Sequence, residues 1–416
     1  MLIRKLNDAI SRGLWPASAD DNAKRLLAAK ALRATADGYV SILLPAYLIE
    51  LGFDSFQVGL ITTATLLGSA GATLLTGFMT ARLGYRRALL AATALMMGTG
   101  ISFAAVRSFW PLLLIAFVGT LNPSSGDVSL FLPLEQSLLS HSVADRDRTT
   151  LFARYSLVAA LFGAVGTLLA GTPELARRAL GASALHALQS MFVLYAILGL
   201  AAGSFYRRIV NPPETGRDTG PARLGSSRTV IYRLAALFSL DAFGGGFFVQ
   251  AILALWLFRH FDLSVTAVAS LFFWCNLLVA GSYLIAPLIA RRIGLIRTMV
   301  FTHLPSSLCL IAIPFASSAS LVIELLLLRS LLSQMDVPTR SSYVMAVVTP
   351  PERPAAASVT SVPRSLAAAA SPVIAGYLLD MSSFAWPLLL GGALKIVYDL
   401  LLLTTFRNLQ PPEEGR

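Results

Sequence analysis

The residues of this sequence that could do chemistry are charged side chains within long apolar runs. Four are aspartates well inside such runs: Asp37, Asp127, Asp241 and Asp336. In hydrocarbon an ionised side chain costs about 2.5–3.5 kcal/mol on insertion scales, so each needs a partner or a watery cavity. A buried carboxyl group can also load and release a proton. We therefore predict proton coupling through Asp37, Asp127, Asp241 or Asp336, with bracing of a neighbouring helix as the alternative for Asp37 and Asp241.

The stretch 121–136, LNPSSGDVSLFLPLEQ, is the most unusual of these runs. Its prolines and glycine weaken a helix, and a helix broken at the midplane exposes backbone groups that can bind a solute. The glycines at 244–246 favour a bend or a close helix contact first and a substrate site second, and Pro338 loosens the run at 334–340. Helix flexing without substrate contact is the alternative for 121–136. The predicted substrate-binding residues are Asn122, Ser124, Ser125, Asp127, Gln250, Gln334, Asp336 and Arg340.

Other charged residues could hold helices together or act as a gate. Glu135 and Arg154 are expected at similar depth, where they would form either a permanent brace or a latch that breaks when that face opens. Asp336 and Arg364 would repeat this pair, with Arg340 competing for Asp336. Lys395 and Asp399 stand four residues apart, a spacing at which they are expected to neutralise each other.

Several chemistries find no support in the sequence. There is no G-x-x-x-x-G-K-[ST] phosphate loop and no G-x-S-x-G nucleophile turn, so we expect neither ATP use nor enzymatic activity and no cofactor. The two cysteines, Cys275 and Cys309, are expected to be buried thiols. The histidines are scattered, which predicts no metal site: His141, His186, His260 and His303.

The elements that must position these residues are membrane-spanning helices. The chain is 56% hydrophobic and 13% charged, whereas a soluble domain carries about 25% charge. A span needs about 20 apolar residues. Twelve runs fit, with 171–190 read as an external loop: 31–51, 56–80, 88–106, 111–139, 150–171, 187–206, 231–258, 265–290, 298–317, 320–347, 356–379 and 384–406.

The arginines and lysines fix an orientation. They gather before the first span, where Arg33 is counted with them, and in every second connection, so the positive-inside rule predicts both termini in the cytoplasm. The net charge of +11 is dispersed in this way, which favours a membrane face over nucleic acid. The predicted organisation is a tail at 1–27, a six-helix bundle at 28–206, a Pro/Gly/Arg-rich linker at 207–230, a second bundle at 231–407 and a tail at 408–416.

Two similar turns indicate a duplication. GFMTARLGYRR at 77–87 follows the second run, and PLIARRIGLIR at 287–297 follows the eighth. Pairs of residues about 210 positions apart keep their order in the two halves: Asp37 with Asp241, Asp127 with Asp336, Arg154 with Arg364, and Gly166 with Gly376. The predicted gate or conformational residues are Gly77, Arg82, Gly84, Arg86, Glu135, Arg154, Gly294 and Arg364.

This organisation resembles the major facilitator superfamily over residues 28–407. The resemblance implies an all-α integral membrane protein with twelve transmembrane helices in two pseudo-symmetric six-helix bundles, and a central cavity lined by runs one, four, seven and ten. The family's turn usually reads G-x-L-A-D-R-x-G-R-K, and its matching positions here are Gly77, Arg82, Gly84 and Arg86.

The sequence departs from the family at two places. Ala81 stands where the family's turn has an aspartate that is thought to bias the gate, so another carboxylate must do so, and Glu135 is the first candidate. The fifth run reads GAVGTLLAGTP and lacks the family's G-P-x-x-G-G antiporter signature. The second departure weakens the case for a drug/proton antiporter.

The resemblance implies a secondary active transporter of the inner membrane that works by alternating access. Proton-coupled efflux of a small organic solute is the leading expectation, because the candidate cavity residues mix apolar and aromatic groups with few charges. Proton-coupled uptake of a small metabolite is the alternative, an anionic one if Arg340 faces the cavity. A non-transporting membrane receptor or assembly protein of the same fold is a third reading. The expected partners are the lipid bilayer, protons and a small-molecule substrate.

Overall fold

Helices make up almost all of the ordered secondary structure in the computed structural model of this chain. The structure describes residues 19–124, 129–143, 148–181, 183–211, 224–225, 227–349 and 352–406, with no β-strand among them. Within the helices, the side chains of 76–81, 141, 148–150, 180, 287, 291, 338, 341, 353 and 354 are not described.

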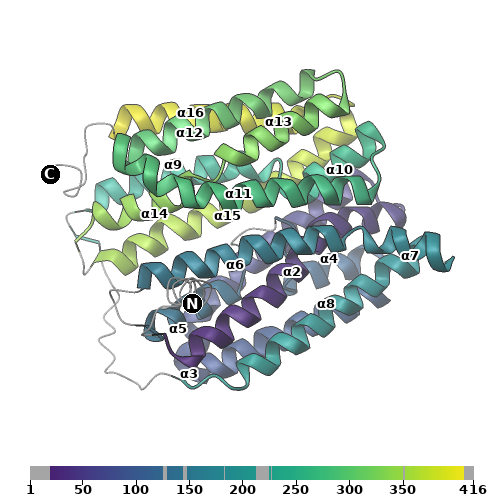
Figure 1. The fold of residues 1–416 in the computed structure, drawn as a ribbon, viewed down its shortest axis with the longest axis horizontal. Coiled ribbons are helices and arrows are strands. Elements are labelled where there is room, and N and C mark those ends of the chain that lie inside the picture. Colours follow the sequence, from purple (N-terminus) through teal and green to yellow (C-terminus); the bar gives the residue numbers. More distant parts are fainter. Residues whose placement is uncertain are drawn as a thin grey trace, which may run out of the picture.

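The first half of the chain forms one bundle, drawn in purple to teal in Figure 1. α2 begins at Asp21, well before the predicted run at 31–51, because Asp20 caps it by accepting a hydrogen bond from the Ala23 N–H. The predicted external loop at 171–190 contains a short helix, α7. The helices of this half are α2 (Asp21–Glu50), α3 (Ser55–Ala105), α4 (Phe109–Val118), α5 (Phe131–His141), α6 (Arg148–Leu169), α7 (Thr172–Leu180) and α8 (Ala184–Tyr206).

The second half forms the other bundle, drawn in green to yellow in Figure 1. Its two interrupted spans are pairs of helices, α9 with α10 and α13 with α14. The helices are α9 (Arg228–Gly246), α10 (Gln250–Phe261), α11 (Val265–Ile293), α12 (Leu295–Ala312), α13 (Ala319–Leu332), α14 (Asp336–Ala346), α15 (Arg353–Met381) and α16 (Trp386–Phe406), with a 3₁₀ turn at Ile313–Phe315.

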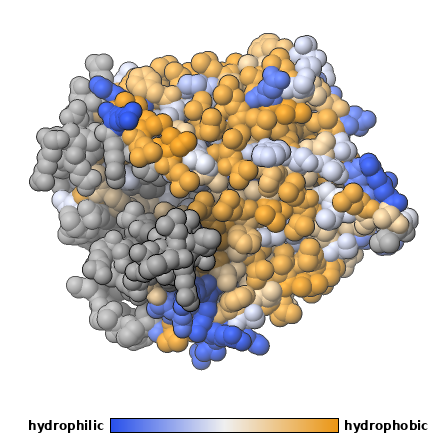
Figure 2. Space-filling view, viewed as in Figure 1, coloured by the Kyte–Doolittle hydropathy of each residue, from blue (hydrophilic) through white to orange (hydrophobic). Residues whose placement is uncertain are grey.

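The predicted twelve spans correspond to these helices. Nine helical stretches among the described residues are long and apolar enough to cross a membrane. The other three predicted spans are α2, which carries several charges, and the fourth and tenth, which are each broken into two shorter helices. Figure 2 shows a broad band of hydrophobic side chains along the helices, with hydrophilic residues toward the two ends. Such a band is what a bilayer core covers.

The two ends of the molecule differ in which segments they hold. We call the end where α8 ends and α9 begins the linker end, and the end where α2 passes into α3 the far end. At the linker end Glu352 accepts hydrogen bonds from the side chains of Thr349 and Ser227, both at 2.8 Å, and from the Gly225 N–H at 2.5 Å. These bonds lower the pKa of Glu352 to about 2, so its carboxylate ties the start of α9 to the start of α15.

The duplicated turn is visible in the backbone. α3 is a double-length run whose helical geometry is interrupted only at Gly84, with φ 75° and ψ 160°. Gly294, between α11 and α12, has φ 87° and ψ 163°. Residues other than glycine rarely adopt this backbone conformation, which explains why a glycine stands at both positions. Arg82 and Arg86 are exposed beside the first turn, and Gly77 lies in the part of α3 whose side chains are not described. The gating role of this turn stays a prediction.

Candidate functional site

Three of the spans predicted to line the centre are broken. The fourth span stops at Val118 and resumes at Phe131, and the seventh is interrupted at 247–249 between α9 and α10. The tenth is interrupted at 333–335 between α13 and α14. Ser125 and Asp127 lie outside the described residues. Interrupted helices free backbone N–H and C=O groups inside the membrane, where each must find a partner.

The breaks of the fourth and seventh spans meet. The Ala251 N–H, at the start of α10, donates to the Pro123 carbonyl oxygen at 3.0 Å. This bond joins the two halves of the chain through backbone groups that neither helix uses. Gln250 stands next to it, and its side-chain Nε2 is buried without a hydrogen-bond partner in the described part of the chain. The structure thus places Gln250, a predicted substrate-binding residue, near the break of the fourth span.

Asp37 belongs to the same region. The Asn122 side chain hydrogen-bonds to Asp37, which connects α2 to the break of the fourth span. Asn122 is 2% exposed, and its side-chain oxygen accepts from the Ser124 N–H at 3.2 Å and hydroxyl at 2.8 Å. The structure therefore brings together three predicted site residues, Asp37, Asn122 and Ser124. Gln334 lies in the break of the tenth span, where its carbonyl accepts from the Val337 N–H at 3.3 Å.

Glu135 is paired inside the first bundle. It is fully buried and forms an ion pair with Arg33 of α2. The Tyr155 hydroxyl donates to Glu135 Oε2, and the Tyr206 hydroxyl donates to Oε1 at 2.5 Å. We call Arg33, Glu135, Tyr155 and Tyr206 the N-terminal cluster.

This arrangement corrects two sequence expectations. Glu135 was expected to pair with Arg154, whereas its described partners are Arg33 and the two tyrosines. Arg33 was counted among the basic residues that precede the first span, but it is 2% exposed within α2. The reason is that α2 begins early and carries Arg33 inward, where the Glu135 carboxylate offsets the cost of burying it.

The second bundle holds a larger buried network. Lys395 Nζ lies 2.5 Å from Asp241 Oδ1, and Arg340 forms ion pairs with Asp336 and with Asp241, the latter at 3.3 Å. The His303 Nδ1 atom lies 2.9 Å from Asp399 Oδ1. These residues come from α9, α12, α14 and α16 and are each at most 9% exposed. We call the C-terminal network Asp241, His303, Asp336, Arg340, Lys395 and Asp399.

The network changes the interpretation of several predicted residues. Lys395 and Asp399 do not neutralise each other as their spacing suggested, because Lys395 pairs with Asp241 while Asp399 pairs with His303. Asp336 pairs with Arg340 and not with Arg364, its predicted partner. Arg364 acts instead on the charge of Asp241.

Sequence reasoning missed His303, because it treated the histidines only as possible metal ligands. An available signal was that the run at 298–317 has a histidine as its one titratable side chain besides a thiol, inside a half with several buried charges.

Glycines let the seventh span approach its neighbours. A Cβ at Gly246 would overlap the Ala368 carbonyl oxygen of α15. A Cβ at Gly245 would lie 3.7 Å from both Cε and Nζ of Lys395. The glycines at 244–246 therefore serve close helix contacts, the first of the two roles that the sequence suggested, and they leave room for the Lys395 side chain.

Two carboxylates join the halves at the far end. Asp380, near the end of α15, accepts from the Ser55 N–H at 3.1 Å and the Phe56 N–H at 2.6 Å, the first amides of α3. Arg259 of α10 donates to the same carboxylate at 2.7 Å. A negative charge is favoured at a helix N-terminus, where amides lack partners. We call this contact the α3 latch.

The second latch repeats the first in the other direction. Glu174 of α7 accepts from the Thr266 hydroxyl at 2.5 Å and from the Thr266 N–H at 3.2 Å, in the first turn of α11. Arg178 pairs with Glu174 at 2.5 Å, as Arg259 pairs with Asp380. We call this contact the α11 latch. The residues Phe56 and Thr266 are 210 positions apart, the same spacing as Gly84 and Gly294, so the two latches are related by the duplication.

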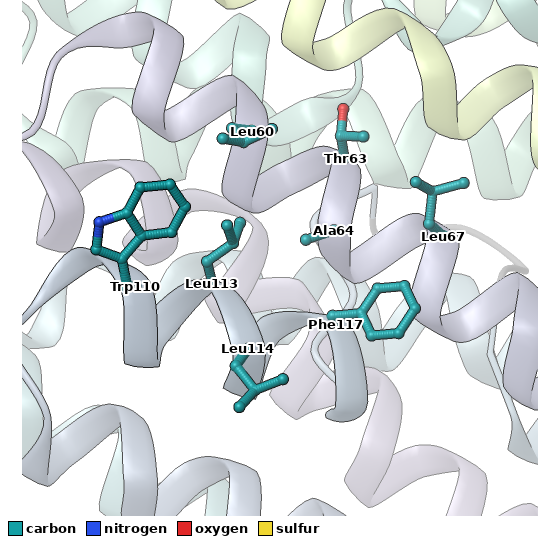
Figure 3. Close-up of a pocket in the computed structure, with 8 residues that line it drawn as sticks. All are labelled: Leu60, Thr63, Ala64, Leu67, Trp110, Leu113, Leu114 and Phe117. Carbon is teal, nitrogen blue, oxygen red and sulfur yellow. The ribbon is translucent and has the colours of Figure 1, made fainter.

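A surface groove of about 390 Å³ lies apart from these sites. Figure 3 shows it between α3 and α4, lined by Leu60, Thr63, Ala64, Leu67, Trp110, Leu113, Leu114 and Phe117. Its single hydroxyl, on Thr63, accepts a hydrogen bond from the Val373 N–H of α15 at 3.0 Å. The groove offers no charge and opens on the apolar surface, so we do not assign the functional site to it.

Comparisons with known proteins agree with this architecture. The family model described as Major Facilitator Superfamily matches residues 26–333 and 234–416. An uncharacterized membrane protein of Saccharomyces cerevisiae, YJR124C, is 24% identical over 418 residues, which cover 92% of this chain and 93% of the yeast protein. The uncharacterized MFS-type transporter YcaD of Escherichia coli is 26% identical over 133 residues, 32% of this chain and 34% of YcaD.

Solved structures share the fold. The crystal structure of the nucleoside transporter NupG has a TM-score of 0.71 at 12% identity and covers 93% of this chain and 100% of its own. A bacterial homologue of the human lysosomal transporter Spinster, in an inward-facing and unoccupied conformation, has a TM-score of 0.69 at 13% identity. It covers 92% of this chain and 95% of its own.

Proposed function

This chain belongs to the major facilitator superfamily of membrane transporters, and from that premise we propose that it moves a small organic solute across the inner membrane by proton-coupled alternating access. The observation that carries the proposal is the meeting of two broken spans, where the Ala251 N–H of the second half bonds the Pro123 carbonyl of the first. Both halves thus present irregular backbone at one place. Such backbone is tolerated within a membrane only where it is buried in protein or lines a cavity.

The substrate site of this proposal lies around that contact. Gln250 supplies a buried amide nitrogen, Nε2, that lacks a hydrogen-bond partner among the described residues. Asp37, Asn122 and Ser124 supply acceptors and donors from the other half. A solute bound here would touch both halves, and it would be released when they rock apart on one side.

The latches support a state that is closed at the far end. The hydrogen bonds and ion pairs found between described residues of the two halves lie at the far end or in the middle of the spans. Since the positive-inside rule puts the linker end in the cytoplasm, we propose that this conformation is inward-facing. Both latches must break for the site to open outward.

Proton coupling and direction are the finer part of the proposal. Asp241 and Asp336 are already paired with Lys395 and Arg340, and Asp399 with His303, which leaves few net charges to repel an apolar solute. We therefore propose efflux in exchange for protons, with uptake as the alternative direction.

One observation favours the anionic alternative. Arg340 is neutralised by two aspartates, but Arg329 of α13 lies over the Phe248 ring, 4.7 Å from its centroid, with no carboxylate partner in the described part of the chain. A cation in such a place can hold a negatively charged group. Phe248 stands in the break of the seventh span, so Arg329 could attract an anion toward the proposed substrate site.

A ligand screen tests the site. Purified protein would be scanned for thermal stabilisation at two pH values against small organic cations, neutral solutes and organic anions, including nucleosides because the structural relative NupG transports them. We expect a ligand whose stabilising effect depends on pH and is lost in Gln250→Leu. The control variant Gln57→Leu, at the far end, should keep the effect. A ligand that stabilises wild type and Gln250→Leu equally would place the site elsewhere.

A further inference from the structure

His303 lies at the centre of the C-terminal network and has charged neighbours on both ring nitrogens. Its Nδ1 atom lies 2.9 Å and 3.0 Å from the two oxygens of Asp399. Its Nε2 atom lies 3.3 Å from Lys395 Nζ and 3.7 Å from Asp241 Oδ1. The side chain is buried, so these groups and not water decide its hydrogen bonding.

The neutral and the protonated ring need different partners. In the neutral ring Nδ1–H donates to Asp399, and Nε2 accepts from the Lys395 ammonium. When one proton joins Nε2, a new N–H bond forms, Nε2 stops accepting, and the ring repels Lys395. The new N–H then points to Asp241, which is the nearest acceptor on that side. Protonation therefore replaces a Lys395–His303 contact by a His303–Asp241 contact.

The other groups around the ring set its charge balance. The joined network has three carboxylates and two permanent cations, Arg340 and Lys395, so one proton on His303 brings the sum from minus one to zero. The Tyr398 ring of α16 packs edge-on against the His303 ring, with 5.9 Å between the ring centroids. Farther out, Arg364 of α15 acts on Asp241, and α13 holds Arg329 over Phe248. α11 has arginines only at its last turn, and its Cys275 faces Leu326 of α13.

Asp241 and Asp336 are poorer proton carriers than the imidazole. Protonating Asp241 would remove the partner of Lys395, and protonating Asp336 would remove a partner of Arg340. A buried cation left unpaired is strongly unfavourable. Protonating His303 leaves no cation unpaired, because Lys395 Nζ still lies 2.5 Å from Asp241 Oδ1.

The network reaches the broken seventh span. Lys395 passes along Gly245, and Asp241 lies on α9 shortly before the break at 247–249. Across that break, the Ala251 N–H bonds the first half of the chain. A change of partner at Lys395 and Asp241 is therefore transmitted by direct contacts to the place where the halves meet.

We propose that His303 is the proton-binding group of the transport cycle and that Lys395 gives up its contact with His303 when the proton arrives. This inference rests on the proposed proton coupling and names its site. The sequence suggested aspartates as the proton-binding groups. The structure points instead to an imidazole, the side chain whose charge changes most readily near neutral pH.

Nuclear magnetic resonance tests the proton itself, without any substrate. Protein labelled with ¹⁵N-histidine would be studied in lipid nanodiscs from about pH 5 to about pH 9, a range that brackets histidine titration. The chain has four histidines, so His303→Gln identifies the resonance. We expect the His303 signal to move with pH, with the neutral ring carrying its hydrogen on Nδ1. In Lys395→Met the Nε2 shift of the neutral ring should change, because its donor is gone. A pH-independent signal, or a neutral ring with its hydrogen on Nε2, overturns the inference.

A second measurement tests whether this proton moves the halves. Spin labels would be placed at Glu50 and Ser383, exposed far-end residues of the two halves, in a variant without the two cysteines. We expect the distance distribution between the labels to change with pH in this background. His303→Gln should abolish that change, whereas His186→Gln should preserve it. A pH response that survives in His303→Gln, or no response at all, contradicts the role of His303. Both measurements need no transport, so their failure is distinct from a failure to observe flux.

Discussion

Removing the charge of the α3 latch should shift the protein toward opening at the far end. Asp380→Asn keeps the size of the side chain and one acceptor oxygen, but it removes the negative charge at the N-terminus of α3 and the ion pair with Arg259. The Arg259 side chain is 44% exposed, so the ion pair is screened and contributes little.

The expected size follows from these two contributions. A charge at a helix N-terminus is worth about 0.3–1 kcal/mol, and an exposed ion pair about 0.2–1 kcal/mol. Together they give roughly 0.5–2 kcal/mol, which corresponds to about a 2- to 30-fold change in the ratio of closed to open far ends. Because the latches are separate and duplicated, Glu174→Gln should act in the same direction, and the double variant should show the product of the two changes.

Distances between the far-end labels at Glu50 and Ser383 measure that ratio. Asp54→Asn is a matched control, since the Asp54 carboxylate caps the same helix from within the first half and accepts from the Gln57 N–H at 2.7 Å. We expect Asp380→Asn to increase the population of long distances and Asp54→Asn to leave it unchanged. Equal effects of the two variants would show that capping of α3, and not a contact between the halves, governs this end.

Three other variants test the packing and charge arguments. Gly246→Ala should lower the melting temperature, because its Cβ would overlap the Ala368 carbonyl oxygen at a cost of about 1–3 kcal/mol, while Gly281→Ala, with open space around it, serves as the control. Glu135→Gln should destabilise the protein by about 3–5 kcal/mol by leaving Arg33 buried and unpaired, and the combined change Arg33→Met with Glu135→Leu should recover most of that loss in denaturation assays. Gly294→Ala should cost about 1–3 kcal/mol because φ is 87° there, and a thermal scan in which it matches wild type would refute the assigned turn.

The helices and the broken spans could be predicted because they depend on local sequence. Apolar length marks the spans, and Pro123 lies in the break of the fourth span, between the end of α4 at Val118 and the start of α5 at Phe131. Gly84 and Gly294 reveal the duplication, since both stand at a turn that needs positive φ. These features need no knowledge of which helices are neighbours.

The charge pairs could not be predicted because they depend on helix rotation and on neighbours. Glu135 has Arg154 near it in sequence, but α2 brings Arg33 closer in space. Lys395 and Asp399 satisfy the spacing rule for a pair within a helix, yet each meets a better-placed partner on α9 or α12. A one-residue uncertainty in a helix rotates a side chain by about 100°, which is enough to exchange such partners.

The carboxylates of the far end were also beyond sequence reasoning. Asp380 directly follows the apolar run at 356–379, and Glu174 lies in the segment 171–190, which the sequence predicts as a loop. Their partners are backbone amides of helices in the other half, and amides carry no sequence signal. Once the structure is known, the duplication explains both carboxylates. Each caps the N-terminus of a helix, and the two capped sites, at Phe56 and Thr266, are 210 positions apart.

The central claim is transport coupled to protons, and flux in proteoliposomes tests it most directly. Vesicles with a ligand from the thermal screen would be given a pH gradient, with protein-free vesicles and a proton ionophore as controls. The account predicts movement of the ligand against its own gradient that requires the protein and stops when the ionophore collapses the pH difference. Binding of the ligand with no flux above protein-free vesicles, together with tight co-purification of another membrane protein, would contradict it and favour a receptor or assembly role.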